Sequence, residues 1–147
     1  MILELSGRTK YALMAMLEMA SIYDTGETLQ IRQIAAAQDI PDRYLEQLLA
    51  TLRRGGLISS ERGKKGGYLL ARSPQKITLL EIVNCMEGGE ASSSETSDDS
   101  EAVSVQAISQ VWQNVKRAAD DVLGKNSLQD LLEKRNYLQN PMAMYYI

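Results

Sequence analysis

Three side chains with hydrogen-bonding ends follow Pro41 in the middle of the chain. Arg43, Glu46 and Gln47 stand at positions i, i+3 and i+4, so a helix would present all three on one face. Arginine can donate two hydrogen bonds to a guanine edge, glutamine can bond an adenine edge, and glutamate can accept from the amino group of cytosine. The set therefore predicts a helix whose N-terminal half reads base edges in the major groove of DNA.

Cations gather again around a run of glycines further along the chain. Between residues 53 and 76 the sequence has seven lysines and arginines but only one acid, Glu61. Arg62, Lys64 and Lys65 lie among the glycines themselves. Such an excess of positive charge is typical of a surface that contacts successive phosphates of DNA. The alternative is that these cations are simply exposed to solvent and bind nothing. The glycines between them would then serve no purpose.

Two helical patterns must position the first set of side chains. The second pattern begins at Pro41, where a proline is tolerated because its missing N–H would be unpaired anyway, and ends near Arg54. It carries an apolar stripe at helical spacing, formed by Leu45, Leu48, Leu49 and Leu52. A shorter amphipathic helix begins upstream at Ile31, and a tight turn at 38–40 joins the two. This arrangement predicts a helix-turn-helix.

Two strand-like runs flank the glycine-rich cations. They span residues 57–61 and 68–71, and the glycines between them can adopt the positive φ of a hairpin loop. Residues 28–30 can add a third short strand. Short helices separated by turns occur in many small helical domains, but the basic hairpin after them favours a DNA-binding head. We therefore expect a mainly α-helical fold, a winged helix-turn-helix with a small β hairpin as its wing.

The motifs that carry a family resemblance are spread over the first half of the chain. They are Leu5-Ser6-Gly7-Arg8, Tyr11-Ala12, Ile34-Ala35, Tyr44-Leu45-Glu46-Gln47-Leu48, Leu52-Arg53, Gly56-Leu57, Arg62-Gly63, Gly66-Gly67-Tyr68, Ile77-Thr78 and Glu81-Ile82. Together they resemble the winged helix-turn-helix regulators of the IscR, NsrR and CymR type, the Rrf2 family. One departure is Asp39, where the family usually has glycine. Aspartate adopts the left-handed conformation more readily than most residues, so the turn remains feasible.

The resemblance implies a role for each group of polar residues. Arg43, Glu46 and Gln47 would read bases in the major groove, and Arg62 at the wing tip would enter the minor groove. Arg8 near the start of the first helix opposes the helix dipole, which makes sense if a DNA phosphate lies there; simple exposure is the alternative. The expected DNA-binding set is Arg8, Arg43, Tyr44, Glu46, Gln47, Arg62, Lys64 and Lys65.

The length and composition of the chain bound its class. Its 147 residues suit one modest domain, or a domain with a helical appendage. The sequence has no apolar run of about 18 residues and no leader pattern, so we expect a cytoplasmic protein without a membrane partner. Its single cysteine, Cys85, cannot form an intrachain disulfide, which agrees with a reducing compartment.

The net charge of −3 is unevenly divided along the chain. Residues 1–76 hold eleven Lys/Arg and eight Asp/Glu, which gives +3, whereas residues 77–147 hold five and eleven, which gives −6. This asymmetry predicts a DNA-binding head in residues 1–76 and an acidic region for dimerisation and sensing in residues 77–147.

The second region contains a serine-rich acidic segment at 90–101, which we expect to be a mobile loop after a short helix at 78–86. Relatives that bind iron–sulfur clusters carry their cysteine ligands in this loop, and here it has none. A cluster needs several thiolates or a substituting histidine, but the chain has one cysteine and no histidine. We therefore expect no cofactor and no metal, and an effector of another, unknown kind.

A long helix is predicted from about Ala102 to Leu123. Its apolar residues follow the spacing of a heptad seam: Val105, Ile108, Trp112, Val115, Ala119 and Val122. Such a seam predicts a homodimer, and the equivalent helix crosses its mate in the resembling family. Packing within one chain is the alternative, but only short helices remain to cover the stripe. A last helix is expected after Ser127, whose side chain can cap it.

Enzymatic functions have little support in the sequence. Without histidine the chain offers no histidine general base and no Ser-His or Cys-His pair. The glycines at 63–67 lie in a predicted hairpin and not between a strand and a helix, as a nucleotide fingerprint requires. We expect a homodimeric, sequence-specific DNA-binding transcriptional regulator that acts on a palindromic operator. The alternative is a winged-helix protein-interaction module without DNA binding.

Overall fold

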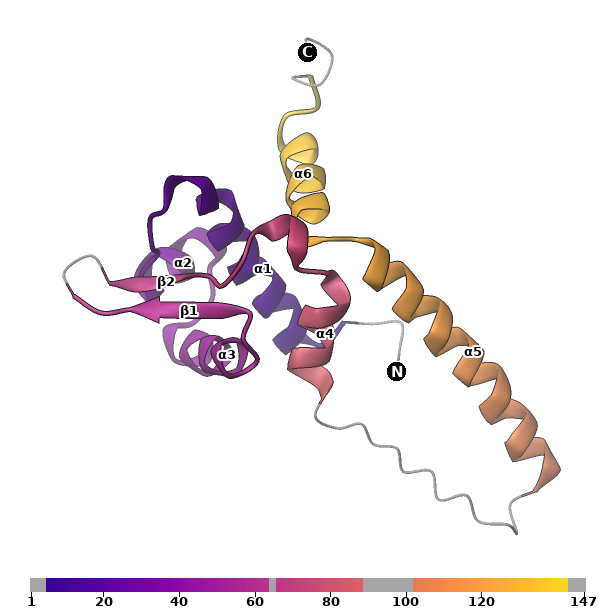
Figure 1. Cartoon of the computed structure of the whole chain (residues 1–147). Helices are drawn as coiled ribbons and strands as arrows, with labels where there is room; N and C mark the ends of the chain where they lie inside the picture. Colours follow the sequence, from indigo (N-terminus) through magenta and orange to yellow (C-terminus); the bar gives the residue numbers. More distant parts are fainter. Residues whose placement is uncertain (1–4, 64–65, 89–101, 143–147) are drawn as a thin grey trace.

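The computed structural model describes residues 5–63, 66–88 and 102–142 of the chain (Figure 1). The predicted acidic loop at 90–101 and the wing residues Lys64 and Lys65 lie outside these ranges. In chain order the elements are α1 (Gly7–Ser21), η1 (Tyr23–Thr25), α2 (Ile31–Gln38), α3 (Asp42–Arg54), β1 (Ile58–Glu61), β2 (Gly67–Leu70), η2 (Pro74–Lys76), α4 (Leu79–Glu87), α5 (Val103–Lys125) and α6 (Leu128–Gln139). This order confirms the predicted mainly α-helical winged helix-turn-helix.

The turn between α2 and α3 depends on one residue with an unusual backbone. Asp39 has φ 56°, in the left-handed region, and its N–H bonds the Ala35 carbonyl. The next residue, Ile40, is 3% exposed and also donates its N–H to Ala35 O, at 3.1 Å. The predicted left-handed aspartate is therefore confirmed, and the chain reverses within three residues before Pro41 precedes α3.

Helix α3 is amphipathic because its leucines recur on one side. The predicted stripe is buried, with Leu45, Leu49 and Leu52 at 0% exposure and Leu48 at 2%. Asp42 lies in the first turn and Arg53 and Arg54 in the last, where each charge complements the helix dipole. The leucines fix the rotation of α3 about its axis, so the opposite face points away from the core.

The wing is a two-stranded antiparallel hairpin in which Ile58 pairs with Leu70 and Glu61 with Gly67. Leu29 forms a further bridge to Tyr68, with N–H···O distances of 2.9 and 2.7 Å in the two directions. Of the third short strand expected at 28–30, the structure forms only this isolated bridge at Leu29, and the sheet has two strands. Gly67 is needed there, because a Cβ on it would lie 2.6 Å from the Leu29 carbonyl oxygen.

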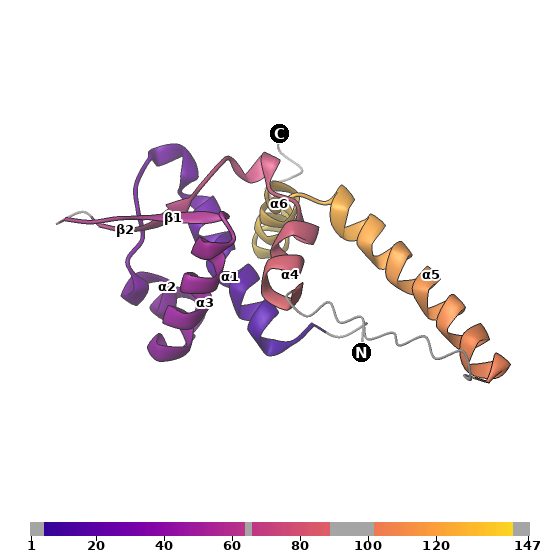
Figure 2. The same cartoon turned by 60° about the horizontal axis from the view of Figure 1, so that its bottom comes forward.

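The hydrophobic core surrounds α1, whose Met16 and Met19 are buried. Helices α4 and α6 contribute to the same cluster through residues such as Ile82 and Leu128. Helix α1 ends at Ser21, and the short helix η1 follows. The C-terminal helix is therefore packed on the helix-turn-helix head, as Figure 2 also shows.

The start of α6 is fixed by local and distant hydrogen bonds. The Ser127 side chain accepts from the backbone N–H of Asp130, whose carboxylate accepts from the Ser127 N–H, which confirms the predicted cap as a full capping box. The Leu128 N–H donates to Ile77 O at 2.8 Å, and the Leu79 N–H donates to Asn126 O at 2.9 Å. These bonds join the starts of α4 and α6.

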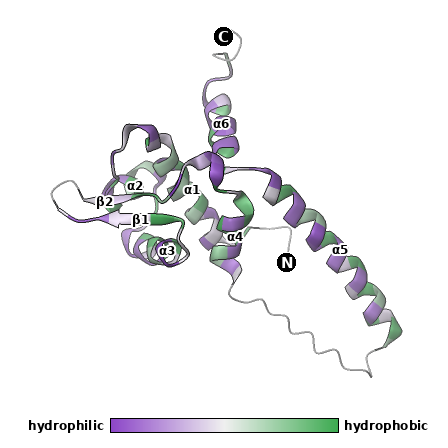
Figure 3. Ribbon diagram, in the orientation of Figure 1, coloured by the Kyte–Doolittle hydropathy of each residue, from purple (hydrophilic) through white to green (hydrophobic). Residues whose placement is uncertain are grey.

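Helix α5 extends away from the rest of the molecule in both cartoon views (Figures 1 and 2). It contacts α4 near its C-terminal end, where Gly124 lies against Leu80, and none of its residues is buried. Apolar and polar residues alternate around it (Figure 3). The side chain of Trp112 is 50% exposed and that of Ile108 is 60% exposed. Within the described ranges, no helix is long and apolar enough to cross a membrane.

Candidate nucleic-acid interface

The outward face of α3 carries the three residues that were expected to read bases. Arg43, Glu46 and Gln47 are all exposed, on the side of the helix opposite the buried leucines. In the described part of the chain no hydrogen bond or ion pair engages their side chains. The structure therefore brings the three predicted residues together with their polar ends free to bind a partner.

Tyr44 lies beside this face and is held by an aromatic neighbour. Its ring meets that of Tyr11 in α1 edge to face, with centroids 5.4 Å apart and planes at 76°. Pairs of this kind contribute about 0.5–1.5 kcal/mol beyond their buried area. Tyr44 is still 38% exposed, so its position is fixed while part of its surface remains accessible.

Arg8 lies near the opposite end of α3. Its guanidinium donates from Nη1 to Met86 O and from Nη2 to Thr51 Oγ1, both at 3.4 Å, close to the limit of a hydrogen bond. The residue is exposed in α1 and bridges toward α3 and α4. Arg8 is therefore separated along α3 from Arg43, Glu46 and Gln47 in its first turns.

Arg62 is exposed just beyond β1, in the loop that joins the two strands of the wing. Lys64 and Lys65 follow it outside the described residues. Arg53, which was not among the predicted contacts, donates from Nη1 to Ser60 Oγ at 3.2 Å and so ties the end of α3 to the wing strand β1. Its place in the basic run of residues 53–76 was the sequence signal for it.

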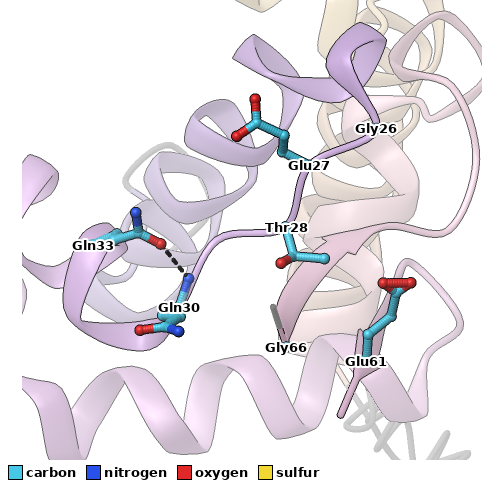
Figure 4. Close-up of a pocket in the computed structure, with 7 residues that line it drawn as sticks. All are labelled: Gly26, Glu27, Thr28, Gln30, Gln33, Glu61 and Gly66. Atoms are coloured by element: carbon cyan, nitrogen blue, oxygen red, sulfur yellow. Dashed lines mark hydrogen bonds between the residues drawn. The ribbon is translucent and has the colours of Figure 1, made fainter. Parts of the chain in front are cut away.

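A polar hollow of about 500 Å³ lies between the wing and the start of α2 (Figure 4). It is lined by Gly26, Glu27, Thr28, Gln30, Gln33, Glu61 and Gly66. The backbone N–H of Gln30 donates to Gln33 Oε1 at 2.8 Å, so the side-chain oxygen of Gln33 already has a partner. Two carboxylates in the lining would repel a phosphate, so the hollow is not suited to hold the DNA backbone.

A profile of the family of winged helix-turn-helix proteins described as "Rrf2: Iron-dependent Transcriptional regulator" matches residues 5–134. The chain belongs to the Rrf2 family. It is 33% identical to the HTH-type transcriptional regulator CymR of Bacillus subtilis, over 97% of this chain and 99% of that protein. It is therefore a transcriptional regulator and not an enzyme.

Two solved structures of Rrf2-type regulators confirm the fold. The structure of IscR from T. potens aligns over 99% of this chain and 98% of its own, with a TM-score of 0.79 and 30% identity. The structure of CymR, the global cysteine regulator of B. subtilis, covers 90% of this chain and 98% of its own, with a TM-score of 0.75 and 32% identity. Both likenesses extend from the head into the C-terminal helices.

The family description implies iron, but the donor atoms of this Rrf2 chain do not suit an iron–sulfur cluster. Its one cysteine, Cys85, is half-buried in α4 with Sγ 3.5 Å from Thr51 O and close to Gly55. Burial raises the pKa of the Cys85 thiol, although Arg54 and Arg8 oppose the shift. Among the described residues no three His, Cys, Asp or Glu side chains gather as a metal site. A cluster needs several thiolates or histidines, and this sequence has neither.

Proposed function

We propose that this Rrf2-family regulator acts as a homodimer that binds a palindromic operator through α3 and the wing. The observation that carries the proposal is the free polar face of α3, where Arg43, Glu46 and Gln47 are exposed while the leucines opposite them are buried. A recognition helix requires this combination of a fixed rotation and unengaged polar ends.

Each group of residues has a separate role in the proposal. The three polar residues of α3 read base edges, and Arg62 enters the minor groove. Phosphates are contacted by the remaining members of the expected set, Arg8, Tyr44, Lys64 and Lys65. Residues 1–76 thus hold the DNA-binding functions, and residues 77–147 hold dimerisation and the response to an effector.

Helix α5 supplies the proposed dimer interface. Its 23 residues extend over about 34 Å, and the seam residues Val105, Ile108 and Val122 are 43%, 60% and 59% exposed. The remaining seam residues are Trp112, Val115 and Ala119. Exposed apolar area of this extent on a protruding helix is typical of a surface that another chain covers. The regulator would act in the cytoplasm, where it meets double-stranded DNA.

The second candidate function is a winged-helix module that docks on a protein and has lost DNA binding. The net charge of −3 favours it, since DNA repels an acidic protein. The two functions differ in their response to salt, because phosphate contacts release counterions and protein docking does not release them to the same extent.

Selection from a pool of random DNA duplexes, followed by footprinting, tests the proposal. A two-fold dimer presents two α3 helices, so the selected site should be palindromic with half-sites about 34–36 Å apart, or a multiple of that distance. If single half-sites bound with full affinity, the dimeric part of the proposal would be wrong. If no sequence were enriched, the protein-docking alternative would replace it.

A further inference from the structure

A polar network links the last helix of the chain to the helix-turn-helix. Glu18 of α1 lies at its centre, and its Oε2 atom accepts from Arg135 Nη1 of α6 at 3.2 Å and from Gln38 Nε2 of α2 at 2.5 Å. The side chains of Arg135 and Glu18 are 26% and 21% exposed, so the ion pair is largely shielded from water. Arg135 and Glu18 are 117 residues apart in the sequence.

The network ends at the turn that aims the recognition helix. Gln38 is the last residue of α2, and the left-handed Asp39 follows it directly. Ile40 and Pro41 then lead into α3, whose rotation sets the direction of the base-reading residues. A hydrogen bond that holds the Gln38 side chain therefore acts next to the residues that orient α3.

The other end of the network depends on the C-terminal helices. Two residues separate the end of α5 from the start of α6, and backbone bonds from Leu79 to Asn126 and from Leu128 to Ile77 fix the junction. These bonds hold the start of α6, the helix that carries Arg135, against the segment that leads into α4. The Nε atom of Arg135 is buried without a partner in the described residues.

We infer that Arg135 and Glu18 are positioning residues for DNA recognition, which act through Gln38 on the helix-turn-helix turn. The inference rests on the proposed function, because it concerns how α3 is held while it reads bases. Removal of one charge leaves the other partly buried without its partner, and the Gln38 side chain loses a fixed acceptor. Helix α3 then keeps its polar residues, but its orientation relative to the rest of the head is less firmly fixed.

A double-mutant cycle on Glu18→Gln and Arg135→Gln tests the inference. For each variant we would measure the ratio of affinities for the selected operator and for a scrambled duplex. We expect each single change to lower this ratio about 3- to 30-fold, and the double variant to lose no more than the worse single variant, because the two residues act as one unit. Lys134→Gln is the matched control, since it removes an exposed positive charge from the same helix and should leave the ratio unchanged.

The ratio separates positioning from stability. A variant that is only less stable reduces the active fraction and weakens both duplexes equally, so its ratio stays constant. Glu18→Gln is isosteric, so it keeps the test available if Arg135→Gln does not fold. If folded Glu18→Gln showed an unchanged ratio of operator to scrambled affinity, the inference would be overturned. So would independent, additive losses in the double variant. If the unsubstituted protein bound no duplex, the proposed function itself would fail, which is a different result.

Discussion

At the scale of single residues, the exposed face of α3 combines two kinds of contact. In the proposed complex, Arg43 and Gln47 would bring donors to purine edges, whereas Glu46 would bring a negative charge toward DNA. A carboxylate at such a surface lowers the affinity for every DNA sequence. It recovers affinity only at a site where it can accept a hydrogen bond from a cytosine amino group. Glu46 is therefore expected to contribute to sequence choice more than to total affinity.

Substitution of Glu46 by alanine separates these two effects. We expect Glu46→Ala to lower discrimination at one base pair by about 1–3 kcal/mol while binding to scrambled DNA stays equal or becomes tighter. Lys64→Ala should weaken all sequences alike and flatten the salt dependence by about one unit. Glu133→Ala, which removes an exposed carboxylate from α6, is the control. Unchanged base preference in a repeated selection with Glu46→Ala would show that α3 is misassigned.

Cys85 allows a second prediction at this scale. Burial raises the pKa of its thiol, so the thiol is protonated at neutral pH and is a poor metal ligand. We expect protein purified without oxygen to be colourless, and Cys85→Ser to bind DNA as the unsubstituted chain does. Iron and sulfide in stoichiometric amounts, lost in Cys85→Ser, would restore the sensor chemistry that the family description implies.

At the scale of elements, the backbone geometry of the wing depends on Gly67. Its φ of 152° and the approach of the Leu29 carbonyl leave no room for a side chain. Gly67→Ala should lower the free energy of unfolding by about 1–3 kcal/mol in a denaturant titration. Gly7→Ala is the matched control, because a Cβ there meets nothing within 4 Å. Equal unfolding free energies for the two variants would mean that the bridge from Leu29 to the wing adds little to stability.

The elements differ in how far the sequence could predict them. The leucine stripe of α3, the cap at Ser127 and the turn at Asp39 depend on neighbours within a few residues, so periodicity and residue type were sufficient. The contact between Glu18 and Arg135 could not be predicted, because it joins helices from opposite ends of the chain. Nothing in the spacing of Glu18 within α1 indicates a partner in the last helix of the chain.

At the scale of the whole molecule, the charge and the apolar surface are separated. The head, residues 1–76, has a net charge of +3, and the remainder has −6. Helix α5 itself holds three cations and two carboxylates, and it extends from the body with its apolar residues exposed (Figure 3). In the proposed dimer joined along α5, each subunit would offer its own basic head to the duplex.

Trp112→Asp tests this assembly. A charge at the centre of the seam would be buried without a partner in the dimer, so we expect a monomer in sedimentation experiments and a large loss of operator affinity. Gln110→Asp places the same charge on the opposite side of α5 and should leave the dimer intact. A dimer of unaltered stability in Trp112→Asp would locate the interface on another surface.

The most direct test of DNA binding by the head is the salt dependence of affinity for a selected duplex and its scrambled counterpart. Each phosphate contact should contribute about −0.9 to the slope of log affinity against log salt. The head offers several cations, so we predict a slope of several units for both duplexes. The selected duplex should bind at least about 1,000-fold more tightly at physiological salt. Absence of binding at low salt, or equal affinity for both duplexes at every salt concentration, would contradict sequence-specific recognition by α3 and the wing.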